Sequence, residues 1–442
     1  MKNYEKTSQY GDKETMVADA RYKFIENATK ISVLKPEHND KENISDKIDK
    51  VLTNKYLAIP IFVLIMYLMF SLTFGWPGTA LSDAIEYFFS DIISPFIENL
   101  LQTASAPGWT EALLVDAVIG GVGGILVFLP QISILFLCLS LLEDSGYMAR
   151  AAFITDRLLS KLGLSGKSFI PMLMGFGCTT PAVMAARTLE NEKDRKLTIM
   201  ITPFMSCGAR LPIYALFAGT FFVANQGLVV FSMYFIGLIV AIASGVLLKK
   251  LIFKGEKPTF IMELPPYRVP GAKSILLHTW EKSKGFIIKA GTIIFSMSIL
   301  IWILQNFDFS LTMVEDNSQS IIAYFGRWIS PIFTPLGFGT WQACVALIAG
   351  LIAKEAVVSS ISGLYAVGGI TITAALTGAF TPLSAFSYMI FCLLYMPCIS
   401  AFITVKKEMN SWKWAFFSAG LQTGTAYVVS LLVYQIGSLF IK

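Results

Sequence analysis

Hydrophobic and polar positions along this chain are separated into long blocks. Seven apolar blocks have about twenty residues or more, the length at which a helix crosses the hydrocarbon core of a bilayer. These blocks are Tyr56–Phe74, Ala117–Leu142, Leu197–Ala224, Leu228–Leu248, Phe286–Leu304, Leu383–Val405 and Trp414–Phe440. The pattern predicts an all-α integral membrane protein with seven or eight transmembrane helices, embedded in a lipid bilayer.

Charges between the blocks indicate the direction of each crossing, because Lys and Arg gather in cytoplasmic loops. The arm before Tyr56 is basic, so we expect the N-terminus in the cytoplasm. Three later segments are basic as well: Glu143–Ser168, Arg187–Lys196 and Lys249–Lys284. Gly75–Asp116 has six acids and no Lys or Arg, so we expect it outside. Within it, Leu81–Leu101 is predicted to lie as an amphipathic helix at the interface.

Two further apolar blocks have both ends on one side. Phe169–Ala186 has basic segments at each end, and Trp341–Tyr365 must begin and end outside if Leu383–Val405 is to return inward. We therefore predict two re-entrant gate hairpins, a geometry that Gly and Pro residues permit. Hairpins that enter from opposite faces indicate an inverted repeat, in which Gly177–Cys178 would match Pro397–Cys398.

The same blocks divide the chain into four expected parts. These are a cytoplasmic N-terminal arm (1–55), a first transmembrane and gate half (56–248), a cytoplasmic linker (249–285) and a second transmembrane and gate half (286–442).

Composition narrows the possible functions. Of the 442 residues, 55% are hydrophobic and only 15% are charged, against roughly a quarter charged in soluble domains. The net charge of +5 is spread over the loops, so no nucleic-acid partner is expected. The chain has only two histidines, which argues against a His-based metal site. Its six cysteines include no CxxC pair, which argues against a disulfide framework. No nucleophile–base–acid set is present, so the sequence predicts a transporter rather than an enzyme, without an organic cofactor.

Three apolar segments are interrupted by Gly or Pro, and each interruption contains a cysteine. The segments are Gly175–Ala182, Pro203–Pro212 and Met396–Ser400. Backbone carbonyls freed at membrane depth are tolerated only inside protein or beside a water-filled path. Thiolates suit soft or borderline transition metals, although a free cysteine is also an ordinary small buried hydrophobe. The interruptions favour a metal role for Cys178, Cys207 and Cys398, and the unbroken runs favour packing for Cys138, Cys344 and Cys392.

Other residues at the interruptions and inside apolar blocks are candidates for a gate or path. They are Gly177, Thr179, Pro181, Ser206, Arg210, Pro397, Glu143, Asp144, Lys354 and Glu355. Charges at membrane depth are costly and usually face a cavity or a partner. Two alternatives stay open: Lys354 and Glu355 form a structural ion pair or a cation-attracting site, and Glu143–Asp144 is a solvated helix end or a gate.

One short motif imitates a nucleotide site. Gly166–Lys167–Ser168 ends like a phosphate loop, but the required glycine five residues earlier is Lys161 and no strand precedes it. A basic cytoplasmic turn explains the motif better.

Three contiguous segments resemble the bacterial ferrous iron transport protein B: Leu141–Phe153, Gly175–Glu190 and Ser206–Pro212. The resemblance extends from about Val17 to the C-terminus. It implies two inverted gate regions related to those of nucleoside transporters, and Fe²⁺ carried into the cytoplasm across the bacterial cytoplasmic membrane by a multi-pass protein. The gate cysteines thought to contact iron in that family fall on Cys178 and Cys398 and, by a weaker match, on Cys207.

The chain departs from that family in two ways. Members normally begin with a GTP-binding domain and a helical spacer, whereas this chain has no phosphate loop and Val17–Ile25 looks like the junction that follows the GTPase. The GTPase is therefore a separate subunit, was removed, or is absent from this branch. Small accessory proteins and a homo-oligomer are further partners that the resemblance allows.

The second departure is Thr179, where many members carry Asn. It leaves open the alternatives of another divalent metal, Zn²⁺ or Mn²⁺, and of an organic-solute carrier of the nucleoside type.

Overall fold

The computed structural model describes residues 13–32, 44–54, 56–104, 107, 110, 113–161, 164–253, 266–310, 312–314, 317–365 and 371–440. The chain forms two compact units, 1–51 and 52–442. The first contains α2 (Lys13–Ser32) and most of α3 (Ile44–Leu52). In the described residues of the second unit, helices are joined by turns, and one isolated β-bridge links Phe307 to Met313.

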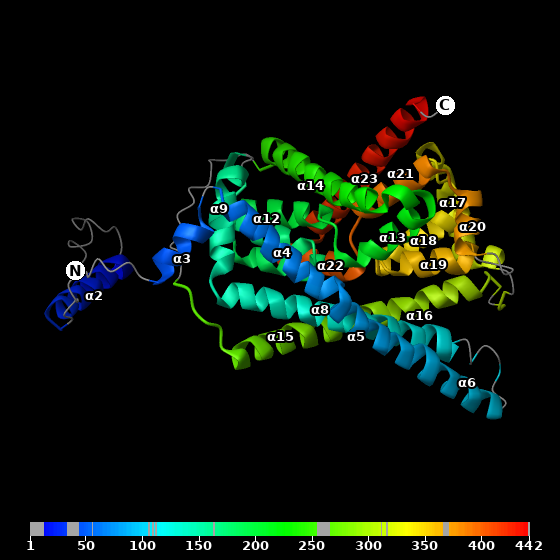
Figure 1. Ribbon diagram of the computed structural model, residues 1–442, viewed down its shortest axis with the longest axis horizontal. Coiled ribbons are helices and arrows are strands. Elements are labelled where there is room, and N and C mark those ends of the chain that lie inside the picture. The colour runs from blue at the N-terminus through cyan, green and yellow to red at the C-terminus, as the bar shows by residue number, and fades with distance from the viewer. Residues whose placement is uncertain are drawn as a thin grey trace. The chain divides into compact units, whose positions relative to one another are not determined.

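The first apolar block forms α4 (Ala58–Phe74) and is followed by α5 (Trp76–Tyr87), a π-helical turn and α6 (Ser94–Thr103). Figure 1 shows these helices following one another as a long run. The run is interrupted at Gly75, where a Cβ atom would lie 2.1 Å from the Ser71 carbonyl oxygen. Only glycine avoids that clash, so the chain can change direction there.

The second block forms α8 (Gly120–Asp144), which leads into α9 (Tyr147–Lys161). Much of the expected linker is helical, because α15 (Ala272–Phe286) lies within it. A π-helical turn joins α15 to α16 (Thr292–Asn306), and both helices pack along α8 (Figure 1). The linker is therefore only in part a loop.

Two groups of helices share one order of elements. Each group has a pair of short helices that pack on one another, then an interrupted helix, then one long helix. In the first group these are α10 (Phe169–Gly175), α11 (Thr179–Ala185), α12 (Glu192–Ile201), α13 (Leu211–Phe221) and α14 (Gln226–Leu251). In the second they are α18 (Trp341–Ile352), α19 (Ala356–Tyr365), α21 (Pro382–Leu394), α22 (Ile399–Met409) and α23 (Trp412–Phe440). Before the second pair lies α17 (Ile321–Phe333), and α20 (Ile372–Ala379) follows that pair.

Contacts between the two groups are reciprocal, since α11 packs against α22 and α13 packs against α19. This order aligns the interruption at 176–178 with 353–355, and the one at 202–210 with 395–398. The correspondence therefore differs from the expected match of Gly177–Cys178 with Pro397–Cys398, because those residues belong to different kinds of element. The entry of the two hairpins from opposite membrane faces stays a prediction.

Six helical runs in the described residues are long and apolar enough to cross a membrane, and seven if the pair α17 and α18, bent by 102°, is one span. The runs are Ala58–Thr103, Gly120–Asp144, Glu192–Phe221, Val223–Leu251, Pro382–Met409 and Trp412–Phe440. The count of seven equals the lower of the two numbers of transmembrane helices predicted from the sequence, which were seven and eight. Within the described residues, Ile294–Asn306 is a shorter apolar helix, and the crossing expected at Phe286–Leu304 stays a prediction.

The main core lies where the two groups meet. Phe217 of α13 and Phe338 each pack on Tyr388 of α21, with ring centroids 5.1 Å apart in both cases. Aromatic pairs of this kind contribute about 0.5–1.5 kcal/mol beyond their burial. Lipid tails are as apolar as these side chains, so close packing rather than exclusion from water joins the groups.

Candidate functional site

The four interruptions of the short and interrupted helices meet at one buried cavity of about 90 Å³. Residues 176–178, 202–210, 353–355 and 395–398 all approach it, and α8 and Phe74 close the remaining side. A cavity of this size holds several water molecules or one hydrated ion. The interruptions are therefore parts of a single site.

Nine of the residues predicted from the sequence line this cavity: Gly177, Cys178, Thr179, Cys207, Arg210, Lys354, Glu355, Pro397 and Cys398. The other four lie elsewhere. Pro181 and Glu143 line a second cavity. The Ser206 hydroxyl is buried and lies 3.0 Å from the Tyr214 hydroxyl. Asp144 Oδ2 lies 3.9 Å from His278 Nδ1.

The three cysteines at the cavity occupy equivalent local positions. Cys178 directly precedes α11, Cys398 directly precedes α22, and Cys207 precedes the turn that leads into α13. All three are free thiols with extended or nearly extended backbone. Each therefore stands at the N-terminal end of a helical element.

The thiols do not form a finished coordination site in this conformation. Cys178, Cys207 and Cys398 are near enough for their charges to interact. No group of three His, Cys, Asp or Glu side chains within the described ranges is close enough to hold a metal ion. The donors would have to approach one another before they could share a cation.

Lys354 and Glu355 do not form the ion pair considered from the sequence. Lys354 Nζ donates instead to the Met396 carbonyl oxygen at 2.8 Å and lies 3.1 Å from the centroid of the Tyr395 ring. Glu355 is the one acidic residue among those that line the cavity in the described part of the chain. A cation-attracting role for Glu355 stays a prediction.

Some polar residues at the cavity were missed by sequence reasoning. Gln131 reaches it from α8, and Thr180 and Ser400 lie directly beside interruptions that the sequence did indicate. A glutamine next to Pro130 inside an apolar block was the available signal for the first of these.

A wider cavity of about 1070 Å³ adjoins the first and shares Thr180, Phe286 and Ser400 with it. It lies between α8, α10, α11, α15 and α22. Its charged lining residues are Glu143, Lys167, Arg187, Glu281, Lys282 and Lys407. The two cavities thus adjoin, and residues of the basic segments line the wider one.

Ion pairs surround the wider cavity. Arg187 forms a two-pronged hydrogen-bonded ion pair with Glu408, and this contact raises the pKa of the Arg187 guanidinium. Lys167 Nζ lies 2.8 Å from Glu190 Oε1, and the hydrogen bond holds the pKa of the Glu190 carboxyl below its usual value. Lys282 Nζ lies 3.3 Å from Glu143 Oε2, so Glu143 is paired with α15.

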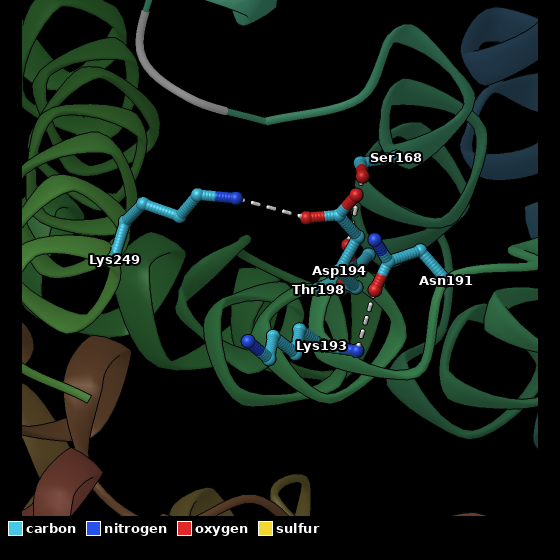
Figure 2. A network of polar contacts seen from close by, with 6 residues as sticks. All are labelled: Ser168, Asn191, Lys193, Asp194, Thr198 and Lys249. Atoms are coloured by element: carbon cyan, nitrogen blue, oxygen red, sulfur yellow. Dashed lines mark hydrogen bonds and ion pairs between the residues drawn. The ribbon is translucent and has the colours of Figure 1, made fainter. Parts of the chain in front are cut away.

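The Gly166–Ser168 turn is tied into the fold. The Gly166 N–H donates to Asp156 Oδ1 at 2.8 Å, and Thr198 Oγ1 donates to Ser168 Oγ at 2.8 Å. Figure 2 shows this contact beside the Lys249–Asp194 ion pair of 3.1 Å, which joins α14 to α12. These contacts fix the turn to α9 and α12.

Comparison with known proteins identifies the family. A family model described as Gate, nucleoside recognition, matches residues 125–221 and 287–412, and a model described as ferrous iron transport protein B C terminus matches residues 230–282. The chain belongs to the ferrous iron transport protein B family. The Gate matches contain all four interruptions and all three cavity cysteines of this family member.

Individual relatives agree with this assignment. The chain is 47% identical over 421 residues to a protein named Fe(2+) transporter FeoB from Staphylococcus aureus, covering 95% of this chain and 63% of the relative. It is 42% identical over 442 residues to the protein of the same name from Methanocaldococcus jannaschii, covering 98% and 65%. A Porphyromonas gingivalis relative, named as a fusion of Fe(2+) transport protein A with Fe(2+) transporter FeoB, is 39% identical over 477 residues, covering 97% and 56%.

The chain thus spans less than two thirds of the length of these relatives. No solved structure matched it.

Proposed function

We propose that this chain carries Fe²⁺ across the bacterial cytoplasmic membrane into the cytoplasm through the cavity that Cys178, Cys207 and Cys398 line. The observation that carries the proposal is the convergence of four helix interruptions and three free thiols on one buried cavity. The names of the relatives support iron as the transported substrate. The role is transport, with no catalytic step assigned to this chain.

The geometry suits transient binding. Sulfur donors, the Glu355 carboxylate and freed main-chain carbonyls are all present at the cavity, but no three charged donors of the described chain are already gathered. A pathway must bind an ion well enough to admit it and loosely enough to release it. The ion would then leave past Thr180 and Ser400 into the wider cavity.

The donor set and the cavity size favour some substrates over others. Thiolates suit Fe²⁺ and Zn²⁺ and disfavour Mn²⁺ and Mg²⁺, which prefer oxygen ligands. The cavity at the thiols, of about 90 Å³, is below the 300–1,000 Å³ typical of organic-ligand pockets, but the adjoining cavity of about 1070 Å³ is large enough for a nucleoside. Zn²⁺ is therefore the competing metal, and a nucleoside is the competing organic solute.

Two partners fit the proposal. A small accessory protein is suggested by the Porphyromonas gingivalis relative, whose name joins transport protein A to the transporter. A GTP-binding domain or subunit, which the resemblance to the family implies, is the second, and residues 1–442 themselves contain no phosphate loop.

The test is flux into liposomes that hold an Fe²⁺-quenched dye. The full chain should quench the dye on addition of Fe²⁺, with Zn²⁺ competing and Mn²⁺ and uridine having little effect. Empty liposomes and the double variant Cys178→Ser/Cys398→Ser are the controls. Uridine uptake, or equal Fe²⁺ quenching by protein and empty liposomes, would overturn the proposal.

A further inference from the structure

Two cationic side chains lie buried at the cavity. Arg210 has 0% of its surface exposed and Lys354 has 2%. Neither forms an ion pair with an acidic residue in the part of the chain that the structure describes. A buried charge is costly unless hydrogen bonds or a counter-charge compensate it, so both need a physical explanation.

Arg210 is held by the interruption between α12 and α13. Its Nη1 donates to the Met205 carbonyl oxygen at 2.9 Å, and Nη1 and Nη2 both donate to the Pro203 carbonyl oxygen, at 3.3 and 3.2 Å. These carbonyls lack helical partners because the helix stops at Ile201. The guanidinium therefore closes a loop of main chain, and Cys207 lies inside that loop.

Lys354 also donates to a main-chain carbonyl oxygen in a helix interruption, but it lies on a different element. It lies between α18 and α19, and its ammonium group donates to the Met396 carbonyl oxygen in the interruption between α21 and α22. The ammonium also lies over the Tyr395 ring, a favourable cation–π position. Lys354 thus ties two interruptions together, and Cys398 follows two residues after the carbonyl that it holds.

Both cations match the charge of a fully loaded site. A divalent metal that drew together all three thiolates and the Glu355 carboxylate would carry 2 − 3 − 1 = −2, and Arg210 with Lys354 would add +2, so the sum would be zero. Charge–charge energies are large in a water-poor site, so a neutral loaded state is strongly preferred there. Thiolates next to Lys or Arg are also the reactive, metal-binding form of cysteine.

We propose that Arg210 and Lys354 are positioning residues, which hold the main chain around Cys207 and Cys398 in place and provide the counter-charge for a thiolate-bound divalent metal. The counter-charge rests on the proposed function. The positioning role stands on the hydrogen bonds to Pro203, Met205 and Met396.

The experiment uses three variants of the full chain: Lys354→Met, which removes charge and donor; Lys354→Gln, which keeps a donor; and Lys354→Arg, which keeps the charge. Gln422→Leu is the matched control. Gln422 is equally buried, and its Nε2 donates to the Met200 carbonyl oxygen at 3.2 Å, but it does not line the cavity.

The first readout is the maleimide labelling rate of Cys398 as the single cysteine, in detergent without metal. Lys354→Met should label on the order of tenfold faster than Lys354→Gln, which has the same charge, since only the methionine loses the hydrogen bond. Gln422→Leu should label at a rate close to that of the parent. Equal rates for Lys354→Met and Lys354→Gln would overturn the positioning role.

The second readout is the apparent KM for Fe²⁺ flux on the native cysteine background, with a melting curve for each variant. Lys354→Gln should raise KM on the order of tenfold while Lys354→Arg stays within about threefold of the parent. An unchanged KM in Lys354→Gln would overturn the counter-charge.

If the parent itself moves no Fe²⁺, the proposed function fails and the labelling contrast still decides the positioning role. If Lys354→Met does not fold, Arg210→Lys labelled at Cys207 replaces it: faster labelling supports positioning, and an unchanged rate refutes it.

Discussion

The six cysteines differ in what their backbone does. Cys178, Cys207 and Cys398 each precede a helical turn and line the cavity. Cys138, Cys344 and Cys392 lie within α8, α18 and α21 as buried helical residues. A thiol inside a regular helix meets packed side chains, whereas a thiol at an interruption can meet an ion.

Serine substitution should therefore separate the two groups. Cys178→Ser and Cys398→Ser should each cut the initial Fe²⁺ flux per folded protein at least about tenfold, because serine is a poorer donor for a soft or borderline metal. Cys138→Ser and Cys344→Ser should leave flux per folded protein nearly unchanged. Liposome flux and a melting curve for every variant measure this. Four equal fluxes would mean that the cysteines only pack.

Close packing against the cavity wall requires a glycine at position 177. A Cβ atom there would lie 2.4 Å from Leu135 Cδ2, and Leu135 is buried and lines the cavity. Gly177→Ala should cost about 1–3 kcal/mol through overpacking. Gly420→Ala is the control, since nothing lies within 4 Å and the helix interior should gain up to about 1 kcal/mol. Melting temperatures in detergent compare them, and a Gly177→Ala protein as stable as the parent would contradict the packing described.

At the scale of elements, the ends of α11 and α22 are joined by Arg187 and Glu408. Glu408 has only 6% of its side chain exposed, whereas Arg187 is 53% exposed. Arg187 also lines the wider cavity, so the pair stands at its edge. The contact joins the two helix groups beside the wider cavity.

Charge reversal tests this contact. Arg187→Glu and Glu408→Arg should each lower stability by about 1 kcal/mol, and the double variant should recover most of it. Arg187 is largely exposed, so the coupling stays modest in salt. A double-mutant cycle of melting free energies measures it. A double variant that is no more stable than the sum of the single changes would show that the pair contributes nothing.

The neighbouring Lys167–Glu190 pair predicts a pH dependence. Because the folded pKa of Glu190 lies below its unfolded value of about 4.3, the contribution of the pair is present above that pH and is lost as the pH falls through the folded pKa. Glu190→Gln should flatten this part of the profile, and Lys167→Gln should do the same. Melting temperatures between about pH 3 and pH 7 decide; an unchanged profile in both variants contradicts the assignment.

At the scale of the whole molecule, the charge pattern and the packing of α10 on α11 predict that these two helices form a re-entrant hairpin. A helix pair between two basic segments should turn back inside the membrane, so the positions of Lys161 and Lys193 should share a face. Single cysteines at these positions, on a cysteine-free background, should react with a membrane-impermeant maleimide from one side of sealed vesicles. Labelling from opposite sides would refute the hairpin.

The helices, their interruptions and the candidate donors could be predicted from the sequence alone. Apolar block length placed the helices, and Gly and Pro placed the interruptions, because helix formation depends on neighbours within about four residues. Cys178, Cys207 and Cys398 were recognisable for the same reason, as thiols at interruptions. The division of the run Ala272–Asn306 was not recognisable, since a π-helical turn has no clear signature in the residues.

Contacts between distant segments were decided only by the tertiary structure. Arg187 and Glu408 are 221 residues apart, and Lys354 reaches Met396 rather than the adjacent Glu355. Which carbonyl lacks a helical partner, and which cation can reach it, depends on how separate helices pack. The sequence by itself therefore determined a membrane protein with interrupted helices and soft donors. The fold alone decided that those donors share one cavity, because side-chain packing sets which interruptions meet.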